Sequence, residues 1–240
     1  MTPGGARLLR SVPQRAALGA CLAFALSACA IDRLGEGTEA DRISTGFAVS
    51  QDGHWLTAAH GVTDCAAILV SPELGDPVFA QIRAIDGSAD LALLRTPTQA
   101  NGAARIAASR PEEGAQLQLI GYPGRVEAPV VDVVTARYDP RAPIGRRIGL
   151  EGVVRPGHSG APVLSDDGWV VGVAIQALDA SVEATDETPD FGLAVDPALV
   201  VRFLEAQGLE LSEGTNVASR QVFSEAASRF LARVECYEPG

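Results

Sequence analysis

The chain of 240 residues is long enough for one medium-sized domain or two small ones, and 47% of its residues are hydrophobic, so it can bury a substantial core. Its formal net charge is −11, and removal of the first 28 residues, which hold three arginines and no acid, leaves −14. These values describe an acidic globular protein and exclude nucleic acid as a natural partner.

The first 28 residues have the pattern of an export signal. Three arginines precede an apolar run over residues 16–28, which is too short to span a bilayer stably. The run ends in Leu-Ser-Ala-Cys, which resembles the lipobox of bacterial lipoproteins and predicts Cys29 as the lipidated first residue. Ala30 after this cysteine is typical of an outer-membrane address, so we expect a membrane anchor on the periplasmic face of the bacterial outer membrane. The alternative is an ordinary signal peptide cut near residue 28 or 30, which would give a periplasmic or secreted protein.

Residues 29–42 are polar and contain glycine, which predicts a short tether. Beyond them, short apolar runs alternate with Gly, Asp, Pro and Ser, a pattern typical of an all-β barrel or sandwich. A polar, proline-bearing segment near residues 100–114 divides the runs into two groups and favours two small barrels over one large one. The expected strands lie at residues 44–50, 54–59, 66–71, 78–85, 90–96, 116–122, 128–138, 146–152, 169–177 and 191–195.

A serine flanked by glycines, in Gly157-His158-Ser159-Gly160, raises the first functional question. Such a tetrapeptide is either a tight turn or a nucleophile whose backbone approaches a reacting carbonyl, and a nucleophile needs a base. His60 follows the strand expected at 54–59, and Asp90 opens the apolar run at 90–96. The order His60, Asp90, Ser159 is that of one version of the Ser-His-Asp triad.

At these residues the chain resembles the trypsin-like serine proteases of the chymotrypsin fold, and among them the bacterial high-temperature-requirement proteases. The resemblance runs from about Ser44 to Leu204, and it rests on STGFAVS with HWLTAAH, DGSADLALL, GHSGAPV with GWVVGV, and FGLAVDPALV. It implies a protease domain over residues 43–205 with two six-stranded antiparallel β-barrels, followed by C-terminal helices. It also implies a serine endopeptidase that hydrolyses exported proteins or peptides without a cofactor.

The resemblance assigns roles to these residues. Ser159 is the nucleophile, His60 the general base and acid, and Asp90 the residue that orients His60. Asp86 is the rival acid, but the apolar run follows Asp90 immediately, as in the family motif, so we expect Asp86 in a surface turn. The backbone N–H groups of Gly157 and Ser159 are expected to form the oxyanion hole, since glycine permits the turn that aims its N–H at the developing charge.

The remaining histidines, His54 and His158, are expected to be exposed and not catalytic. With only three histidines and no clustered cysteines, we expect no metal site. His158 stands where digestive relatives have an aspartate that pairs with a newly cut amino terminus, so activity should not require cleavage near Ile43. Ala161 stands where a glycine is more usual, a difference of one methyl group.

The expected substrate pocket has no carboxylate at its base. Val153, six residues before the serine, occupies that position, so the side chain before the cleaved bond should be small or medium and apolar rather than Arg or Lys. By the same resemblance the pocket walls are Val173, Ala174, Ile175, Gln176, Gly192, Leu193 and Ala194.

Two other classes of protein fit the same chain. One is an exported binding protein that kept the fold and lost the activity, and the other is a structural lipoprotein. The complete set of His60, Asp90 and Ser159 favours the protease.

Residues 206–240 are too few for the peptide-binding module that often follows this type of protease domain, and we expect a helical extension there. Phe223, Ala227, Phe230, Leu231 and Val234 mark one helical face, which should dock on the amino-terminal barrel. The exported chain keeps two cysteines besides Cys29, and in an oxidising compartment they predict a Cys65–Cys236 disulfide. Two free thiols, or a bridge between chains through Cys236, remain the alternatives.

Overall fold

The computed structural model describes residues 39–138, 147–177, 191–211 and 226–239. The predicted export signal, Cys29 and most of the tether lie outside the described residues. Residues Glu39–Gly240 form one compact unit, and the structure is discussed for that unit alone.

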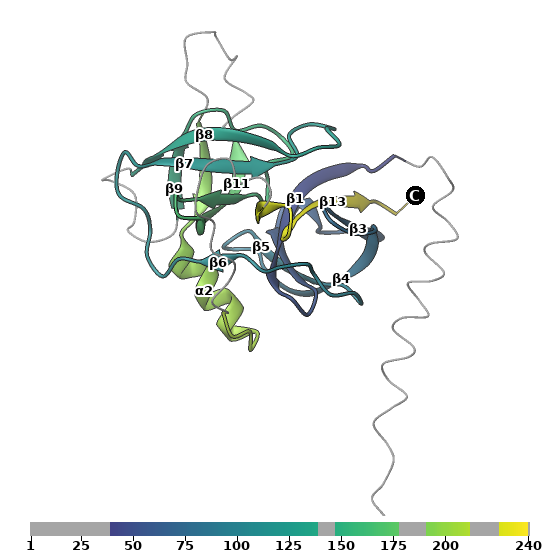
Figure 1. Cartoon of the computed structure of the whole chain (residues 1–240). Helices are drawn as coiled ribbons and strands as arrows, with labels where there is room; N and C mark the ends of the chain where they lie inside the picture. Colours follow the sequence, from purple (N-terminus) through teal and green to yellow (C-terminus); the bar gives the residue numbers. More distant parts are fainter. Residues whose placement is uncertain (1–38, 139–146, 178–190, 212–225, 240) are drawn as a thin grey trace, which may run out of the picture. The chain divides into compact units, whose positions relative to one another are not determined.

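Six antiparallel strands close the first barrel (Figure 1). Their order around the barrel is β1-β13-β3-β4-β5-β2. Apolar side chains of these strands pack into one core, in which Phe47, Trp55 and Leu56 are all at least 98% buried. The strands are β1 (Arg42–Ser50), β2 (His54–Ala58), β3 (Ala67–Pro72), β4 (Val78–Asp86), β5 (Leu91–Arg95) and β13 (Leu231–Tyr237).

The second barrel follows along the chain. Its sheet has the order β10-β7-β8-β9-β12-β11-β6, and an additional pairing of β10 with β11 closes six of these strands into a ring. β6 joins the ring from outside, parallel to β11. The strands are β6 (Arg105–Ile106), β7 (Gln116–Gly121), β8 (Val130–Arg137), β9 (Arg147–Glu151), β10 (Pro162–Leu164), β11 (Trp169–Ala177) and β12 (Phe191–Val195). Two six-stranded antiparallel barrels confirm the predicted fold class.

One α-helix, α2 (Pro197–Ala206), lies directly after β12 in the described part of the chain. The Asp196 carboxylate caps it by accepting a hydrogen bond from Ala198 N, and Pro197 occupies the first turn, where a missing N–H costs nothing. Val200 and Leu204 are fully buried and attach the helix to the body of the protein. None of the described helices is long and apolar enough to cross a membrane.

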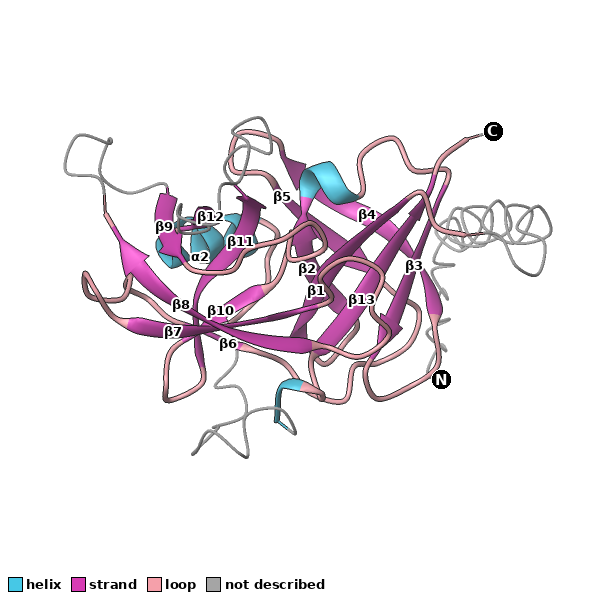
Figure 2. Ribbon diagram, turned by 90° about the horizontal axis from the view of Figure 1, so that it is seen from above, coloured by secondary structure: helices cyan, strands magenta, loops and turns pink. Residues whose placement is uncertain are grey.

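Each of the ten predicted strands is present, but the C-terminal segment is a correction. Residues 231–237, predicted as part of a helix, form strand β13, which pairs with β1 on one side and β3 on the other (Figure 2). Without β13, both of these strands would expose unpaired backbone groups, and two rows of hydrogen bonds outweigh local helix propensity. The predicted docking on the amino-terminal barrel therefore occurs as strand insertion. Phe223 lies outside the described residues.

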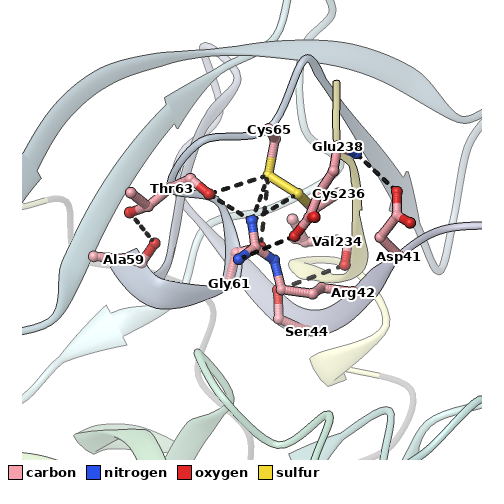
Figure 3. The surroundings of a disulfide bond; sticks show 10 residues. All are labelled: Asp41, Arg42, Ser44, Ala59, Gly61, Thr63, Cys65, Val234, Cys236 and Glu238. Carbon is pink, nitrogen blue, oxygen red and sulfur yellow. Dashed lines mark hydrogen bonds and ion pairs between the residues drawn. A yellow bond between two sulfur atoms is a disulfide. The ribbon is translucent and has the colours of Figure 1, made fainter. Parts of the chain in front are cut away.

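A disulfide joins Cys65 to Cys236 and fixes β13 to the segment that follows His60, with a Cα–Cα distance of 5.5 Å. Figure 3 shows Arg42 against this bond, with Nη2 3.1 Å from Cys236 Sγ and donating to the carbonyl oxygen of Thr63. The side-chain hydroxyl of Thr63 donates in turn to Ala59 O, which belongs to the turn that carries His60. The end of the chain is thus linked to the neighbourhood of the predicted base.

Candidate active site

His60 leaves the first barrel on the short 3-10 turn η1 (Ala59–Gly61), directly after β2. Its ring is half exposed, and each nitrogen has a partner: Nδ1 lies 2.7 Å from Asp90 Oδ2, and Nε2 lies 2.9 Å from Ser159 Oγ. The structure therefore brings together three residues that are 30 and 99 positions apart in the sequence. This geometry allows a proton to pass between the hydroxyl and the imidazole.

Asp90 is held by the turn between β4 and β5. It has a left-handed backbone with φ of 58°, a conformation that aspartate tolerates better than most residues. Its Oδ1 accepts a hydrogen bond from His60 N at 2.9 Å, so the carboxylate contacts both the backbone and the ring of His60. Asp86, predicted as a surface turn residue, accepts from Ser88 N and Ala89 N and thereby shapes this turn.

Ser159 belongs to a turn that ends at β10 in the second barrel. Gly157 and Gly160 both have positive φ, 98° and 84°. A Cβ at Gly157 would overlap the Tyr122 carbonyl oxygen, and a Cβ at Gly160 would overlap the Thr45 carbonyl oxygen. Glycine is therefore required at both positions by conformation and by space.

Thr45 of β1 is a site residue that sequence reasoning missed. Its hydroxyl donates to Gly157 O at 2.7 Å and accepts from Tyr122 N, while its backbone N–H donates to Ser159 O at 2.8 Å. These contacts pin the serine turn to the first barrel. A threonine inside an apolar strand carries no local signal for such a role.

The two predicted oxyanion donors face no acceptor in the described part of the chain. The backbone N–H groups of Gly157 and Ser159 make no hydrogen bond there, whereas the carbonyl oxygen of Pro156 accepts from Gly124 N at 2.7 Å. The carbonyl group of the peptide between Pro156 and Gly157 therefore points toward Gly124. The opposite side of that peptide, which carries the Gly157 N–H, is left available to a ligand.

His158 is buried, contrary to the prediction that it is exposed. Its exposed fraction is 0%, and its Nδ1 accepts a hydrogen bond from Arg155 N at 3.1 Å. The pKa of His158 is lowered to about 4, chiefly by burial; the Asp132 carboxylate acts in the opposite direction, and nearby Arg155 contributes to the lowering. His54 is half-buried, and its Nδ1 lies 3.1 Å from Ser50 Oγ.

The predicted pocket residues lie on two paired strands and on the segment before Ser159. Ser159 Oγ lies 3.4 Å from Ile175 O, and Val173, Ala174 and Ala194 are fully buried. Val154 packs so closely on Gly192 that a Cβ there would lie 2.7 Å from the valine side chain. Val153 and Leu193 are half-buried, and the side chain of Gln176 and the neighbouring residues 178–190 lie outside the described part.

Ser159 also lines a cavity of about 380 Å³. None of the predicted pocket residues lines it. Its walls come from β1, the 60–61 turn and the loops before β8 and β10, and they include Arg42 and Arg125 beside His60, Gly157 and Ser159. Both arginines are paired, with Glu238 and Glu39.

The described residues contain no group of three or more His, Cys, Asp or Glu side chains arranged to hold a metal ion.

Comparison with known proteins gives one family. Residues 44–173 match the trypsin-like peptidase domain. A probable periplasmic serine endoprotease, DegP-like, from Chlamydia muridarum is 33% identical over 154 residues, which cover 57% of this chain and 29% of that protein. An uncharacterized protein, y4bJ, from Sinorhizobium fredii is 30% identical over 206 residues, which cover 82% of this chain and 32% of that one. The chain thus spans about a third of the length of these relatives.

Solved structures agree with this family. The crystal structure of the active form of the Rv3671c protease from M. tuberculosis has 25% sequence identity and a TM-score of 0.58, over 70% of this chain and 74% of that one. A serine endoprotease from Yersinia pestis, at 21% identity with a TM-score of 0.56, shares the fold over 69% of this chain and 57% of that one.

Proposed function

Because the chain belongs to the trypsin-like peptidase domain family, whose relatives support serine protease activity, we propose that it is a serine endopeptidase with the triad His60, Asp90 and Ser159. The observation that carries the proposal is the continuous chain of contacts from Asp90 Oδ2 to His60 Nδ1, at 2.7 Å, and from His60 Nε2 to Ser159 Oγ, at 2.9 Å. This is the geometry of a nucleophile, a base and a group that orients the base.

In the proposed reaction, Ser159 Oγ attacks the scissile carbonyl while His60 Nε2 takes its proton. Collapse of the tetrahedral intermediate breaks the C–N bond, and His60 returns the proton to the leaving amine. Water then repeats the sequence on the acyl-enzyme. Asp90 accepts the Nδ1 proton in a hydrogen bond throughout and stabilises the imidazolium that forms in each half-reaction.

The N–H groups of Gly157 and Ser159 would stabilise the oxyanion of each tetrahedral intermediate. Their lack of an acceptor within the described residues, and the orientation of the 156–157 peptide, support this role. Loss of one such donor typically costs a factor of about 10² to 10³ in rate.

For specificity we propose small or medium apolar side chains before the cleaved bond. Val153, Val173 and Ile175 bring no charge to the proposed pocket. A peptide library in which cleavage follows Arg or Lys would contradict this specificity.

The substrates we propose are exported proteins and peptides. Relatives are named as periplasmic serine endoproteases, and the predicted signal with Cys29 would anchor the chain to a membrane facing that compartment. Residues 43–205 would supply the protease domain.

A fluorophosphonate active-site probe tests the proposed activity. Wild-type protein should be labelled, Ser159→Ala should not, and Ser159→Ala should also lose peptide hydrolysis by about 10⁴-fold or more while keeping its fold. Ser165→Ala, in the turn between β10 and β11, is the matched control and should label like wild type. A wild-type protein that is folded but never labelled would instead be the catalytically silent binding or structural protein.

A further inference from the structure

His158 is the residue directly before Ser159, and its imidazole is enclosed by protein. Because Nδ1 accepts the hydrogen bond from Arg155 N, the single proton of the neutral ring resides on Nε2. The backbone adds a second link in the same turn, since His158 N donates to Arg155 O at 3.0 Å. One histidine therefore closes the 155–158 turn twice, through its side chain and through its main chain.

The other side of the ring faces a carboxylate. His158 Nε2 lies 3.5 Å from Asp132 Oδ2, which comes from β8. Neither atom has a hydrogen-bond partner within the described residues, and both are buried. A buried donor and a buried acceptor without partners each cost free energy, and the 3.5 Å contact with one another is the interaction described for both atoms. The ring thus connects the 155–158 turn to the wall of the second barrel.

This connection acts on the backbone groups proposed for catalysis. Gly157, with its N–H, lies inside the turn that His158 closes, and Ser159 follows immediately. Thr45 and Gly124 hold the same turn from its other side, through Gly157 O, Ser159 O and Pro156 O. If the imidazole were removed, Arg155 N would lose its acceptor and the turn would lose its contact with Asp132, while the backbone bond from His158 N to Arg155 O would remain.

We propose that His158 and Asp132 form a positioning pair, which holds the Gly157 N–H and Ser159 in the geometry needed for oxyanion stabilisation. The proposal rests on the proposed peptidase function. The groups that face the ring are Asp132 of β8 and Arg155 of the turn itself, while Gly121 of β7 contributes only backbone against its edge. Neither His158 nor Asp132 touches the substrate in this scheme.

The test compares three side chains at position 158. His158→Leu removes both ring contacts, and we expect kcat per folded molecule to fall by about 100-fold or more with KM changed by less than about threefold. His158→Asn offers an amide oxygen near the place of Nδ1 and restores an acceptor for Arg155 N, so it should recover at least tenfold in kcat over the leucine variant. His54→Leu, at a half-buried histidine of the first barrel, is the control and should keep wild-type kcat.

The partner is tested in the same assay. Asp132→Asn keeps an acceptor for Nε2–H and should retain most of kcat, whereas Asp132→Ala should lower kcat and the rate of fluorophosphonate labelling together. The two Asp132 variants also test the positioning role if His158→Leu does not fold.

Three results would overturn the positioning role: wild-type kcat in folded His158→Leu, equal kcat in the leucine and asparagine variants, or an activity loss that only follows the unfolded fraction measured by circular dichroism. These differ from failure of the proposed function, in which wild-type protein itself would not label.

Discussion

At the scale of single residues, Asp90 allows a test of the orienting role in the proposed triad. Its carboxylate binds both the backbone and the ring of His60. Asp90→Asn keeps the size and one acceptor oxygen, but its amide nitrogen can present an N–H to Nδ1 and so favour the wrong tautomer. We expect kcat to fall by about 10⁴-fold, measured by steady-state peptide hydrolysis. Asp86→Asn is the control, and a similar loss there would mean that the turn, rather than the Asp90 charge, supports catalysis.

A second prediction at this scale concerns acid stability. Because burial lowers the pKa of His158 in the folded state to about 4, the folded protein binds fewer protons here than the unfolded chain between that pKa and the ordinary value near 6.5. The contribution of neutral His158 to the free energy of unfolding is complete above pH 6.5. It falls by up to about 3 kcal/mol as the pH drops toward 4. Urea unfolding at pH 7, 5.5 and 4.5 measures it.

The reference for this titration is His158→Asn, which lacks the ionisable ring and retains His54, whose pKa burial also lowers. The free energy of unfolding should fall more steeply with acid in wild type than in the variant. Parallel curves would contradict a buried neutral His158.

The positions of His60, Asp90 and Ser159 could be predicted from the neighbouring sequence, whereas the burial of His158 could not. His60, Asp90 and Ser159 could be predicted because each stands at a fixed place beside an apolar run or between glycines, and the structure brings them within hydrogen-bonding distance. His158 is buried against Asp132 of β8, which lies 26 positions earlier in the sequence. No pattern near either residue reports that contact.

At the scale of elements, the strand β13 shows the same limit. Ala227, Phe230, Leu231 and Val234 fit a helical period, but seven residues of this segment are placed as a strand by the open edges of β1 and β3. The ten strands could be predicted from the sequence because their apolar runs and bounding turns are local features. The C-terminal strand β13 could not be predicted in this way, because its partner strands lie some 160 to 190 positions away in the sequence.

The disulfide gives β13 a measurable contribution to stability. A bridge that closes 171 residues restricts the unfolded chain by an amount that the entropy model puts at roughly 5 kcal/mol as a ceiling, and measured bridges contribute about 2–4 kcal/mol. We therefore expect Cys65→Ser with Cys236→Ser to lower the free energy of unfolding by 2–4 kcal/mol in urea titration. Dithiothreitol should shift the wild-type midpoint to that of the double variant and leave the variant unchanged. A wild-type midpoint that ignores the reductant would argue against the bond in the folded protein.

At the scale of the whole molecule, the described unit carries everything that the proposed reaction uses. His60, Asp90, Ser159 and the proposed oxyanion donors all lie within the compact unit Glu39–Gly240. His158 lies against Asp132 in the buried surroundings of the residue before Ser159, and we still expect activity without a newly cut amino terminus. A mutation that abolishes the predicted membrane attachment should therefore leave the proposed catalysis intact.

Cys29→Ser tests this separation. Loss of the predicted lipid site should move the protein from the membrane fraction to the soluble periplasmic fraction, because acyl chains provide the affinity for the bilayer. Its kcat and rate of fluorophosphonate labelling should remain within about twofold of wild type, since residue 29 lies ten positions before the compact unit. Ser27→Ala, a change next to the predicted cleavage site that keeps the cysteine, is the matched control and should stay with the membrane. An unaltered membrane fraction for Cys29→Ser would refute lipidation, whereas release together with loss of labelling would show that the catalytic unit depends on its anchor.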